Sequence, residues 1–232
     1  MKRNVDMKEI SDGRLYTASD MVKADTGGCQ GCSVCCHGMG NSIILDPYDG
    51  YRLTKECKVS MEELLSKNIE LNMVDGLILP NLKMAGDQEA CSFLNERGRC
   101  SIHSARPGIC RLFPLGRYYE GREFRYFLQI HECPKAGRTK VKVKKWLDTP
   151  DLGRYEEYIR SWHGFLEDVQ HLLDGSEQRN EAEEGDNGSL RRQLCMYLLK
   201  QFFLKPWDIG QDFYPQYEQR LEDGRKLCSL PI

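Results

Sequence analysis

Apolar and polar residues alternate along RYYEGREFRYFLQI, residues 117–130. This period of two is typical of a half-buried β-strand, and Glu120-Gly121 interrupts it near the middle. The pattern therefore predicts a β-hairpin with its turn at Glu120-Gly121. A second alternating run, KVKVKK at 140–145, is expected to extend the sheet. The residues expected on one face of the hairpin are Phe124, Tyr126, Leu128 and Ile130.

A helical period follows in the second half of the chain. Thr149-Pro150 predicts a helix start, with Thr149 as the N-cap and Pro150 at the first helical position. Apolar residues then recur at spacings of three and four and form one seam. We expect this seam to pack within its own domain, and a dimer through the 152–173 helix is the alternative. The seam consists of Leu152, Tyr155, Ile159, Trp162, Leu166, Val169 and Leu173.

Shorter signals organise the first half. SIILDPYDGYRL, residues 42–53, predicts a strand-like run, a proline turn and a short helix. Ser60 and Glu63 have the spacing of a capping box and predict a helix from there to about Leu71. The following segment, 75–90, has the pattern of a strand and a loop.

The end of the chain differs in composition. Residues 174–189 are acidic and lack apolar positions, so they predict a mobile linker. A last helix is expected over about 190–203, followed by a tail that contains Trp and Tyr. We therefore divide the chain into a cysteine-cluster metal-binding module, 1–146, and a helical extension, 147–232.

Composition narrows the functional classes. The chain has 232 residues, of which 40% are hydrophobic and 29% charged, with a net charge of −2. This balance supports a real core and gives no reason to expect a nucleic-acid partner. The first twenty residues lack the apolar core of a signal peptide, and no run is long enough for a membrane span. A cytoplasmic protein is expected.

Eleven cysteines are an odd count and far above ordinary usage. In a chain without an export signal, clustered thiols favour metal binding over disulfides. Cys57, Cys195 and Cys228 lie in predicted helices or the tail and are expected to pack as small apolar residues. The remaining eight form the predicted ligand set: Cys29, Cys32, Cys35, Cys36, Cys91, Cys100, Cys110 and Cys133.

The spacing of these thiols suggests more than one metal ion. Cys29, Cys32 and Cys35 follow the C-x2-C-x2-C run of bacterial ferredoxins. Cys35 and Cys36 are adjacent, with Cα atoms about 3.8 Å apart and diverging side chains, so the two are unlikely ligands of one ion. Eight thiols also divide into two sets of four. We therefore expect two metal centres, or one cluster of high nuclearity, with the 29–36 loop contributing to both.

Charged and imidazole groups accompany the thiols. Arginines offset the negative charge of thiolates, and Arg106 and Arg111 lie closest in sequence to Cys110. We expect both to act beside the metal ligands. Cys100 and His103 have the spacing of a zinc knuckle, and His37 follows Cys36, so either histidine is an alternative ligand that would favour zinc.

Four segments between residues 29 and 134 resemble one known family: CQGCSVCC, ILDPYDGYRL, CSFLNERGRCSIHSARPGICRLFPLGR and HECP. The family is named for its CxxCxxCC signature, is also called YkgJ-type, and is described as a zinc- or iron-chelating domain. The resemblance implies metal chelation. The flagellin lysine N-methylase FliB shares the cysteine pattern, and it implies a third, methyltransferase alternative.

These observations predict an α+β protein: an irregular cysteine-rich metal module with a small antiparallel sheet and flanking helices, plus a helical C-terminal extension. The expected function is to hold iron–sulfur clusters, of the [4Fe-4S] type or larger, for electron transfer or cluster-assisted chemistry. The alternative cofactor is zinc, in a module that interacts with a partner. We find no catalytic triad, phosphate loop or paired carboxylates, so catalytic residues and the partner stay unknown.

Overall fold

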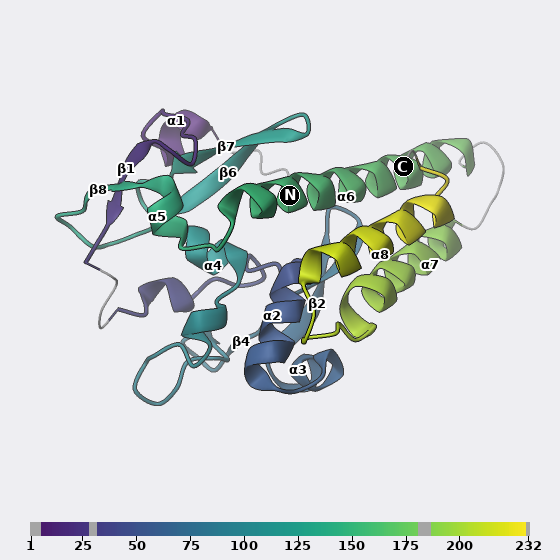
Figure 1. Ribbon diagram of the computed structural model, residues 1–232, viewed down its shortest axis with the longest axis horizontal. Helices are drawn as coiled ribbons and strands as arrows, with labels where there is room; N and C mark the ends of the chain where they lie inside the picture. Colours follow the sequence, from purple (N-terminus) through teal and green to yellow (C-terminus); the bar gives the residue numbers. More distant parts are fainter. Residues whose placement is uncertain (1–5, 28–31, 181–186, 231–232) are drawn as a thin grey trace.

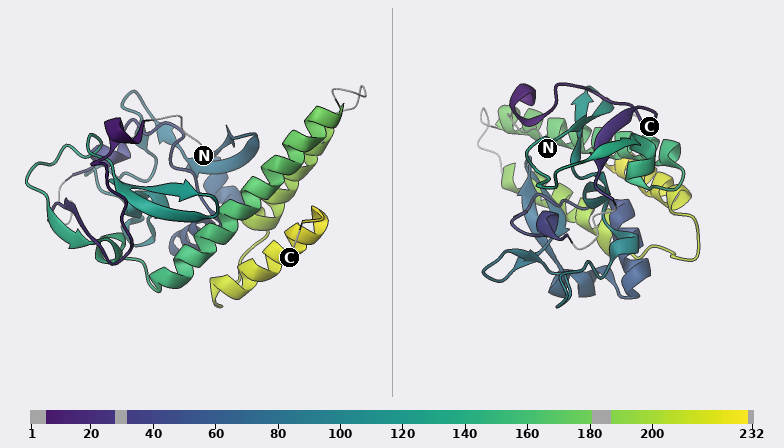
Figure 2. Two further views of the ribbon diagram at one scale, coloured as in Figure 1. Left: turned by 90° about the horizontal axis from the view of Figure 1, so that it is seen from above. Right: turned by 90° about the vertical axis from the view of Figure 1, so that its left-hand side faces the viewer.

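The computed structural model describes residues 6–27, 32–180 and 187–230. Three helices lie side by side along one flank of the molecule, and small sheets and irregular loops occupy the other (Figures 1 and 2). The three helices are α6 (Leu152–Asn180), α7 (Asn187–Leu199) and α8 (Phe213–Leu227). The described residues thus combine a helical layer with a cysteine-rich half.

Each sheet in the described residues is a two-stranded antiparallel pair. This mixture of small sheets and flanking helices confirms the predicted α+β class. The pairs are β1 (Met21–Asp25) with β8 (Thr139–Lys142), β2 (Ile69–Val74) with β3 (Leu77–Leu82), β4 (Met84–Ala85) with β5 (Ala90–Cys91), and β6 (Leu115–Glu120) with β7 (Glu123–Leu128).

The predicted hairpin is β6–β7, and its turn lies one residue later than expected. Glu120 pairs with Glu123, so Gly121 and Arg122 form the turn. Gly121 has a φ of 62°, a left-handed conformation that glycine adopts without strain. Strand β8 does not extend this hairpin. It pairs with β1 from near the N-terminus, a long-range partner that no local pattern indicated.

Two helices carry the apolar half of the first module: α2 (Pro47–Cys57) and α3 (Met61–Lys67). Ser60 is the N-cap of α3, as predicted, and accepts a hydrogen bond from the Glu63 N–H at 3.2 Å. The predicted end at Leu71 was wrong. The chain turns into β2 at Ile69, because residues 69–74 pair with β3.

Helix α6 begins at Leu152, and the predicted Thr149-Pro150 start was two to three residues too early. The Asp151 carbonyl accepts the Tyr155 N–H at 3.0 Å and opens the helix. The predicted seam packs within the chain's own core: five of its seven members are buried, and Leu152 and Leu166 are partly buried. The alternative of a dimer through this helix stays a prediction.

The segment 174–189 differs from its predicted linker. Helix α6 continues through Asn180 and α7 begins at Asn187, while 181–186 lie outside the described residues. Glu, Gln and Arg are good helix formers, so a lack of apolar residues did not end the helix. The expected tail also contains a regular element, α8, whose N-cap is Asp212.

Two hydrophobic cores organise the molecule. The larger core joins α2, α3, β2 and β3 to all three helices of the flank. The smaller lies among β1, β8, the β6–β7 hairpin and α5 (Val143–Leu147). Because the larger core draws residues from both sides of the predicted boundary at 147, the two predicted domains share one core. None of the described helices is both long and apolar enough to cross a membrane.

Phe165 tests how far this shared core stabilises the fold. Its side chain is fully buried in α6, against Trp162 and Phe202. Phe165→Ala should lower the free energy of unfolding by about 3–5 kcal/mol, because a large buried ring leaves a cavity. Urea unfolding followed by circular dichroism measures this change.

The matched control is Leu227→Ala in α8, whose side chain is 58% exposed. It should change stability by no more than about 0.5 kcal/mol. Equal effects of the two variants would contradict the packing described here.

Candidate metal centre

Cys35 and Cys36 lie in a single 3-10 turn, Val34–Cys36, labelled η1. The Cys36 N–H donates to the Ser33 carbonyl at 2.8 Å, and the Gly38 N–H donates to the Glu89 carbonyl at 3.0 Å. These bonds attach the loop to the chain just before Cys91. They explain how two thiols from the start of the module reach a third that is 55 positions later.

The segment 91–110 returns Cys100 and Cys110 to the same region. Leu94 and Cys100 pair across a tight loop, and the Asn95 N–H donates to the Arg99 carbonyl at 2.9 Å. Cys110 lies in the short helix α4 (Gly108–Leu112). Thiols that are distant in sequence thus come to line one cavity, because a loop and a one-turn helix fold back toward η1.

Asp49 fixes the position of α4. This carboxylate is 1% exposed, and its Oδ1 accepts the Gly108 N–H at 2.8 Å, joining α2 to α4. Asp46 caps α2: its Oδ1 accepts the Asp49 N–H, and the Asp49 Oδ2 accepts the Asp46 N–H. Gly108 is required because a Cβ there would lie 2.2 Å from the Tyr155 hydroxyl oxygen.

Arg52, on the same helix, supports the loop before α4. Its guanidinium donates to the carbonyls of Ser104 and Arg106, the latter at 3.2 Å. Helix α2 therefore holds both Arg106 and Cys110 in place. The sequence segment around Asp46 and Asp49 had been interpreted only as a proline turn and a helix, and its capping pattern is the signal that could have identified this role.

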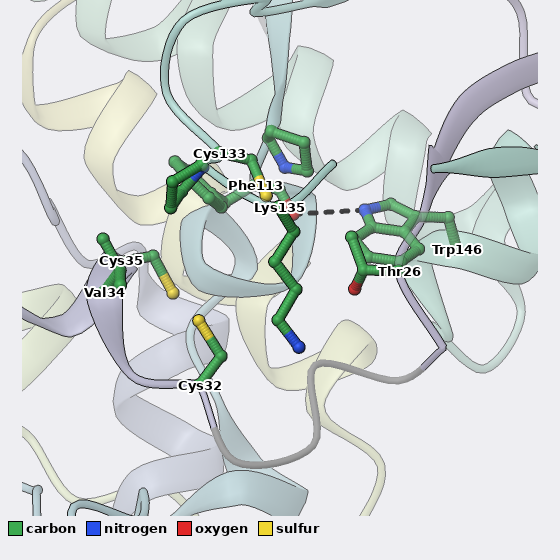
Figure 3. A pocket seen from close by; sticks show the side chains of 10 residues that line it. Thr26, Cys32, Val34, Cys35, Phe113, Cys133, Lys135 and Trp146 are labelled. Carbon is green, nitrogen blue, oxygen red and sulfur yellow. Dashed lines mark hydrogen bonds between the residues drawn. The ribbon is translucent and has the colours of Figure 1, made fainter. Parts of the chain in front are cut away.

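The described thiols of the predicted ligand set line two cavities. Cys32, Cys35 and Cys133 line a small pocket together with Lys135 and Trp146. Figure 3 shows the sulfurs of Cys32 and Cys35 pointing toward each other, with the Lys135 side chain extending into the same space. Cys133 contributes to this pocket from the end of the module, about a hundred residues from Cys32 in sequence.

The second cavity is a large chamber of about 1750 Å³. Cys32 and Cys35 reach it as well, so the η1 loop stands between the two spaces. Four further thiols line the chamber and do not line the small pocket: Cys36, Cys91, Cys100 and Cys110. Cys29, also predicted as a ligand, lies outside the described residues.

The thiols interact electrostatically. A hydrogen bond from the Cys36 thiol lowers the pKa of Cys35 to about 7, and the nearby Arg106 and His37 act in the same direction. The same bond and burial raise the pKa of Cys36, and Cys35, Cys91 and Cys110 add to the effect. The lowered pKa of Cys35 favours its thiolate, the form that binds metal, whereas the pKa of its neighbour Cys36 is raised.

Burial is the largest influence on the pKa values of three further chamber thiols. It raises the pKa values of Cys91, Cys100 and Cys110, and each of these thiols also responds to Cys35. A cation placed among them would offset this cost, because it stabilises the thiolates. As they stand, no three His, Cys, Asp or Glu side chains of the described residues are gathered closely enough to hold one metal ion.

The two predicted arginines differ in their surroundings. Arg106 lowers the pKa values of Cys35 and Cys100, so its charge acts on the thiols. Arg111 is only 6% exposed, and its guanidinium lies 5.8 Å from the Tyr155 ring centre and acts on Asp46 and Asp49. Arg106 has the environment expected of a charge beside the ligands, whereas Arg111 faces the carboxylates.

The alternative histidine ligands also differ. His37 Nδ1 donates to the Ser33 carbonyl at 2.9 Å and so supports the η1 turn. His103 lines the chamber beside Cys100, and burial lowers its pKa, which favours the neutral imidazole that binds metals. Only His103 of these two lines the chamber with the thiols.

The three thiols expected to pack as apolar residues lie apart from both cavities. Cys195 in α7 and Cys228 at the end of α8 are buried in the larger core. Cys57 is half-buried at the end of α2. None of the three lines either cavity in the described part of the chain.

Residues 28–134 match a protein-family model described as "CxxCxxCC: Putative zinc- or iron-chelating domain". The matched range includes all eight predicted ligands and also the α2 carboxylates and α4. No solved structure matches the chain.

The close approach at Gly108 gives a first test of the site. Gly108→Ala should lower the free energy of unfolding by about 1–3 kcal/mol, because the added methyl group overlaps the Tyr155 hydroxyl. It should also lower the metal content, because α4 carries Cys110. Thermal unfolding and elemental analysis measure the two effects.

Gly153→Ala is the matched control, since a Cβ there meets no atom within 4 Å. This variant should keep both stability and metal content. Normal metal content in Gly108→Ala would contradict the role assigned to α4.

The Asp49 carboxyl predicts a pH dependence of stability. Burial, together with the Asp46 charge, raises the pKa of Asp49 from 3.8 to about 8. The unfolded chain loses this proton near pH 3.8 and the folded chain near pH 8. Between these values the folded state binds more protons, so its free energy of unfolding falls as pH rises.

Asp49→Asn should reduce this fall, because the amide has no charge to bury; Asp46, whose pKa burial also raises, should keep part of it. Urea unfolding at several pH values between about 4 and 8 compares the two slopes. An unchanged slope in the variant would show that Asp49 is not the group responsible.

Proposed function

Because residues 28–134 match the model of the CxxCxxCC family of chelating domains, we propose that the chain holds metal in two adjacent thiolate centres. The observation that supports this proposal is that the thiols separate at η1 into two groups, which differ in the cavities that they line. Cys36 lines only the chamber, whereas its neighbour Cys35 also lines the small pocket with Cys32 and Cys133. Cys35 reaches both spaces and Cys36 reaches only one, so the adjacent pair fits two neighbouring centres better than one ion.

The first proposed centre uses Cys32, Cys35 and Cys133, with Cys29 as the fourth ligand supplied by the CxxCxxC spacing. The second uses Cys36, Cys91, Cys100 and Cys110. Each set then has four thiolates, the usual complement of a [4Fe-4S] cluster. Lys135 lies at the first set, and Arg106 acts on Cys35 of the first set and on Cys100 of the second, so both supply positive charge that offsets thiolate charge.

We propose iron–sulfur clusters as the occupants, for electron transfer or cluster-assisted chemistry. The donor sets consist of thiols alone, and the chamber is far larger than a single ion needs. When bound, such clusters supply one-electron redox chemistry. The protein's part is to keep the thiols available, balance their charge and hold the two sets side by side.

Zinc is the second candidate, and His103 is the observation that favours it. Its neutral imidazole lies beside Cys100 in the chamber wall and could replace one thiolate. In that case the module would be structural and would serve a protein partner. A lysine methyltransferase activity like that of FliB stays a prediction.

Metal analysis of cysteine variants tests the two-centre proposal. Protein purified without oxygen should contain iron and acid-labile sulfide. Cys36→Ala and Cys133→Ala should each keep about half of the iron, and the double variant should keep almost none, because each substitution removes a ligand of one four-thiolate set. Visible absorption of the same samples reports the clusters directly.

Cys195→Ala is the control and should keep the full metal content, because its sulfur lies in the larger core. Complete loss of metal in both single variants would replace the two centres by one cooperative site. A colourless protein with about two zinc ions per chain would overturn the iron–sulfur assignment in favour of structural zinc sites.

A further inference from the structure

The chamber extends well beyond the thiols. Its volume of about 1750 Å³ exceeds the 300–1,000 Å³ of ordinary small-molecule sites, so it has room for a metal centre and a further molecule. The wall away from the cysteines is formed by the β6–β7 hairpin and helix α6. Arg117 and Tyr119 come from the hairpin, and Trp162 and His163 come from the helix.

Two guanidinium groups that line the chamber have unused donors: Arg111 of α4, next to Cys110, and Arg117 of the hairpin. Arg111 is 6% exposed, and its Nε and Nη2 are buried without a hydrogen-bond partner. Arg117 donates through Nη2 to the Tyr155 hydroxyl at 3.3 Å, and its Nε is likewise without a partner. Buried donors of this kind are costly unless a ligand or water satisfies them.

Tyr155 brings the two charges together. Both guanidinium carbons lie 5.8 Å from the centre of its ring. Two cations that share one aromatic ring repel each other unless an anion lies between them or beside them. A carboxylate or phosphate is the group that guanidinium binds through paired hydrogen bonds.

The neighbouring acids do not take up these donors. Asp49 uses both oxygens for backbone N–H groups, and Asp46 Oδ1 accepts from the Asp49 N–H. Neither carboxylate forms an ion pair with an arginine among the described residues. Glu167, which also lines the chamber, has its Oε1 3.7 Å from His163 Nε2. Together, the Asp46 and Asp49 carboxylates act on both arginines through space, but they take none of the unpartnered N–H donors at the arginine end of the chamber.

Apolar surface surrounds this charge. Tyr119 packs against His163 with ring centres 3.8 Å apart, and Trp162, Ile159 and Leu166 continue the wall along α6. A ligand that fits here has an anionic end for the arginines and an apolar or aromatic body for the remaining wall.

We propose that the chamber binds a small organic anion, with its carboxylate or phosphate on Arg111 and Arg117 and its apolar body against Tyr119 and Trp162. This goes beyond metal chelation, because it gives the protein a small-molecule site next to the second thiol set. The arginines bind the anionic group of the ligand, and side chains of the hairpin and α6 contact its apolar part.

Calorimetric titration of the full chain, with its metal content measured on the same sample, tests the proposal. The probes are benzoate, phenyl phosphate and the neutral benzamide. Benzoate or phenyl phosphate should bind at one site per chain, and benzamide at least about tenfold more weakly, because it lacks the charge. Comparison of the two anions identifies which acid the site prefers.

Arg117→Gln and Arg111→Gln should each weaken anion binding by about 10- to 100-fold. Arg97→Gln is the control, since Arg97 is exposed and its side chain lines neither cavity. Arg117→Gln is the more informative variant, because Arg117 is farther in sequence from the cysteines, and its metal content should stay normal.

Equal affinity for benzamide and benzoate, no saturable binding of either anion, or full affinity in Arg117→Gln would each overturn the anion site. Metal content is a separate measurement on each sample. If the metal proposal fails, the anion titration can therefore still be interpreted. If the anion site fails, the metal content can still be interpreted.

Discussion

The hydrogen bond from the Gly108 N–H to the buried Asp49 carboxylate is the contact on which the cysteine-rich half depends. It joins the N-terminus of α2, which is packed in the larger core, to the one-turn helix that carries Cys110. A five-residue helix has little stability of its own. Its position, and with it the position of Arg106, Cys110 and Arg111, comes from an acid on a longer helix.

This dependence explains why an acidic residue is buried so close to a set of thiols. The Asp49 charge adds to the burial that raises the pKa of Cys110. Burying a carboxylate is costly, but here both of its oxygens accept backbone N–H groups, and arginines lie nearby. The same residues thus serve the architecture and set the electrostatic conditions for the metal ligands.

The sequence predicted the elements whose cause is local. The alternating 117–130 run gave the hairpin, Ser60 gave a helix cap, and the 3-4 spacing after Leu152 gave the buried face of α6. In each case the pattern reflects which side of one element faces the core. The α+β class followed from these elements together.

The sequence patterns did not predict the elements that depend on partners far away along the chain. Strand β1 pairs with β8 more than a hundred residues later, and Ile69 leaves a helical pattern because β3 is available to pair with it. Helix α8 was taken for a tail, although Phe213, Tyr217 and Gly224 already show helical spacing. The aromatic content of that segment hid its period.

The candidate site also combines features that local sequence suggests with features that only the fold shows. Spacing alone suggested one set of cysteine ligands and separate centres for Cys35 and Cys36, and both stay predictions. It could not show that α2 carboxylates position α4, or that His163, which belongs to the helical extension, reaches the chamber wall. Arg111 was expected beside the metal ligands because it follows Cys110; it lines the chamber with Cys110, and its role beside a metal stays a prediction.

The three tryptophans are distributed so that each reports on a different part of the molecule. Trp146 lines the small pocket with Cys32 and Cys133, Trp162 lines the chamber, and Trp207 lies under the Arg220 guanidinium, whose carbon is 3.5 Å from the ring centre. Variants that keep one tryptophan at a time therefore turn the chain's own fluorescence into separate optical signals. Emission can then be followed independently at each cavity and in the helical layer.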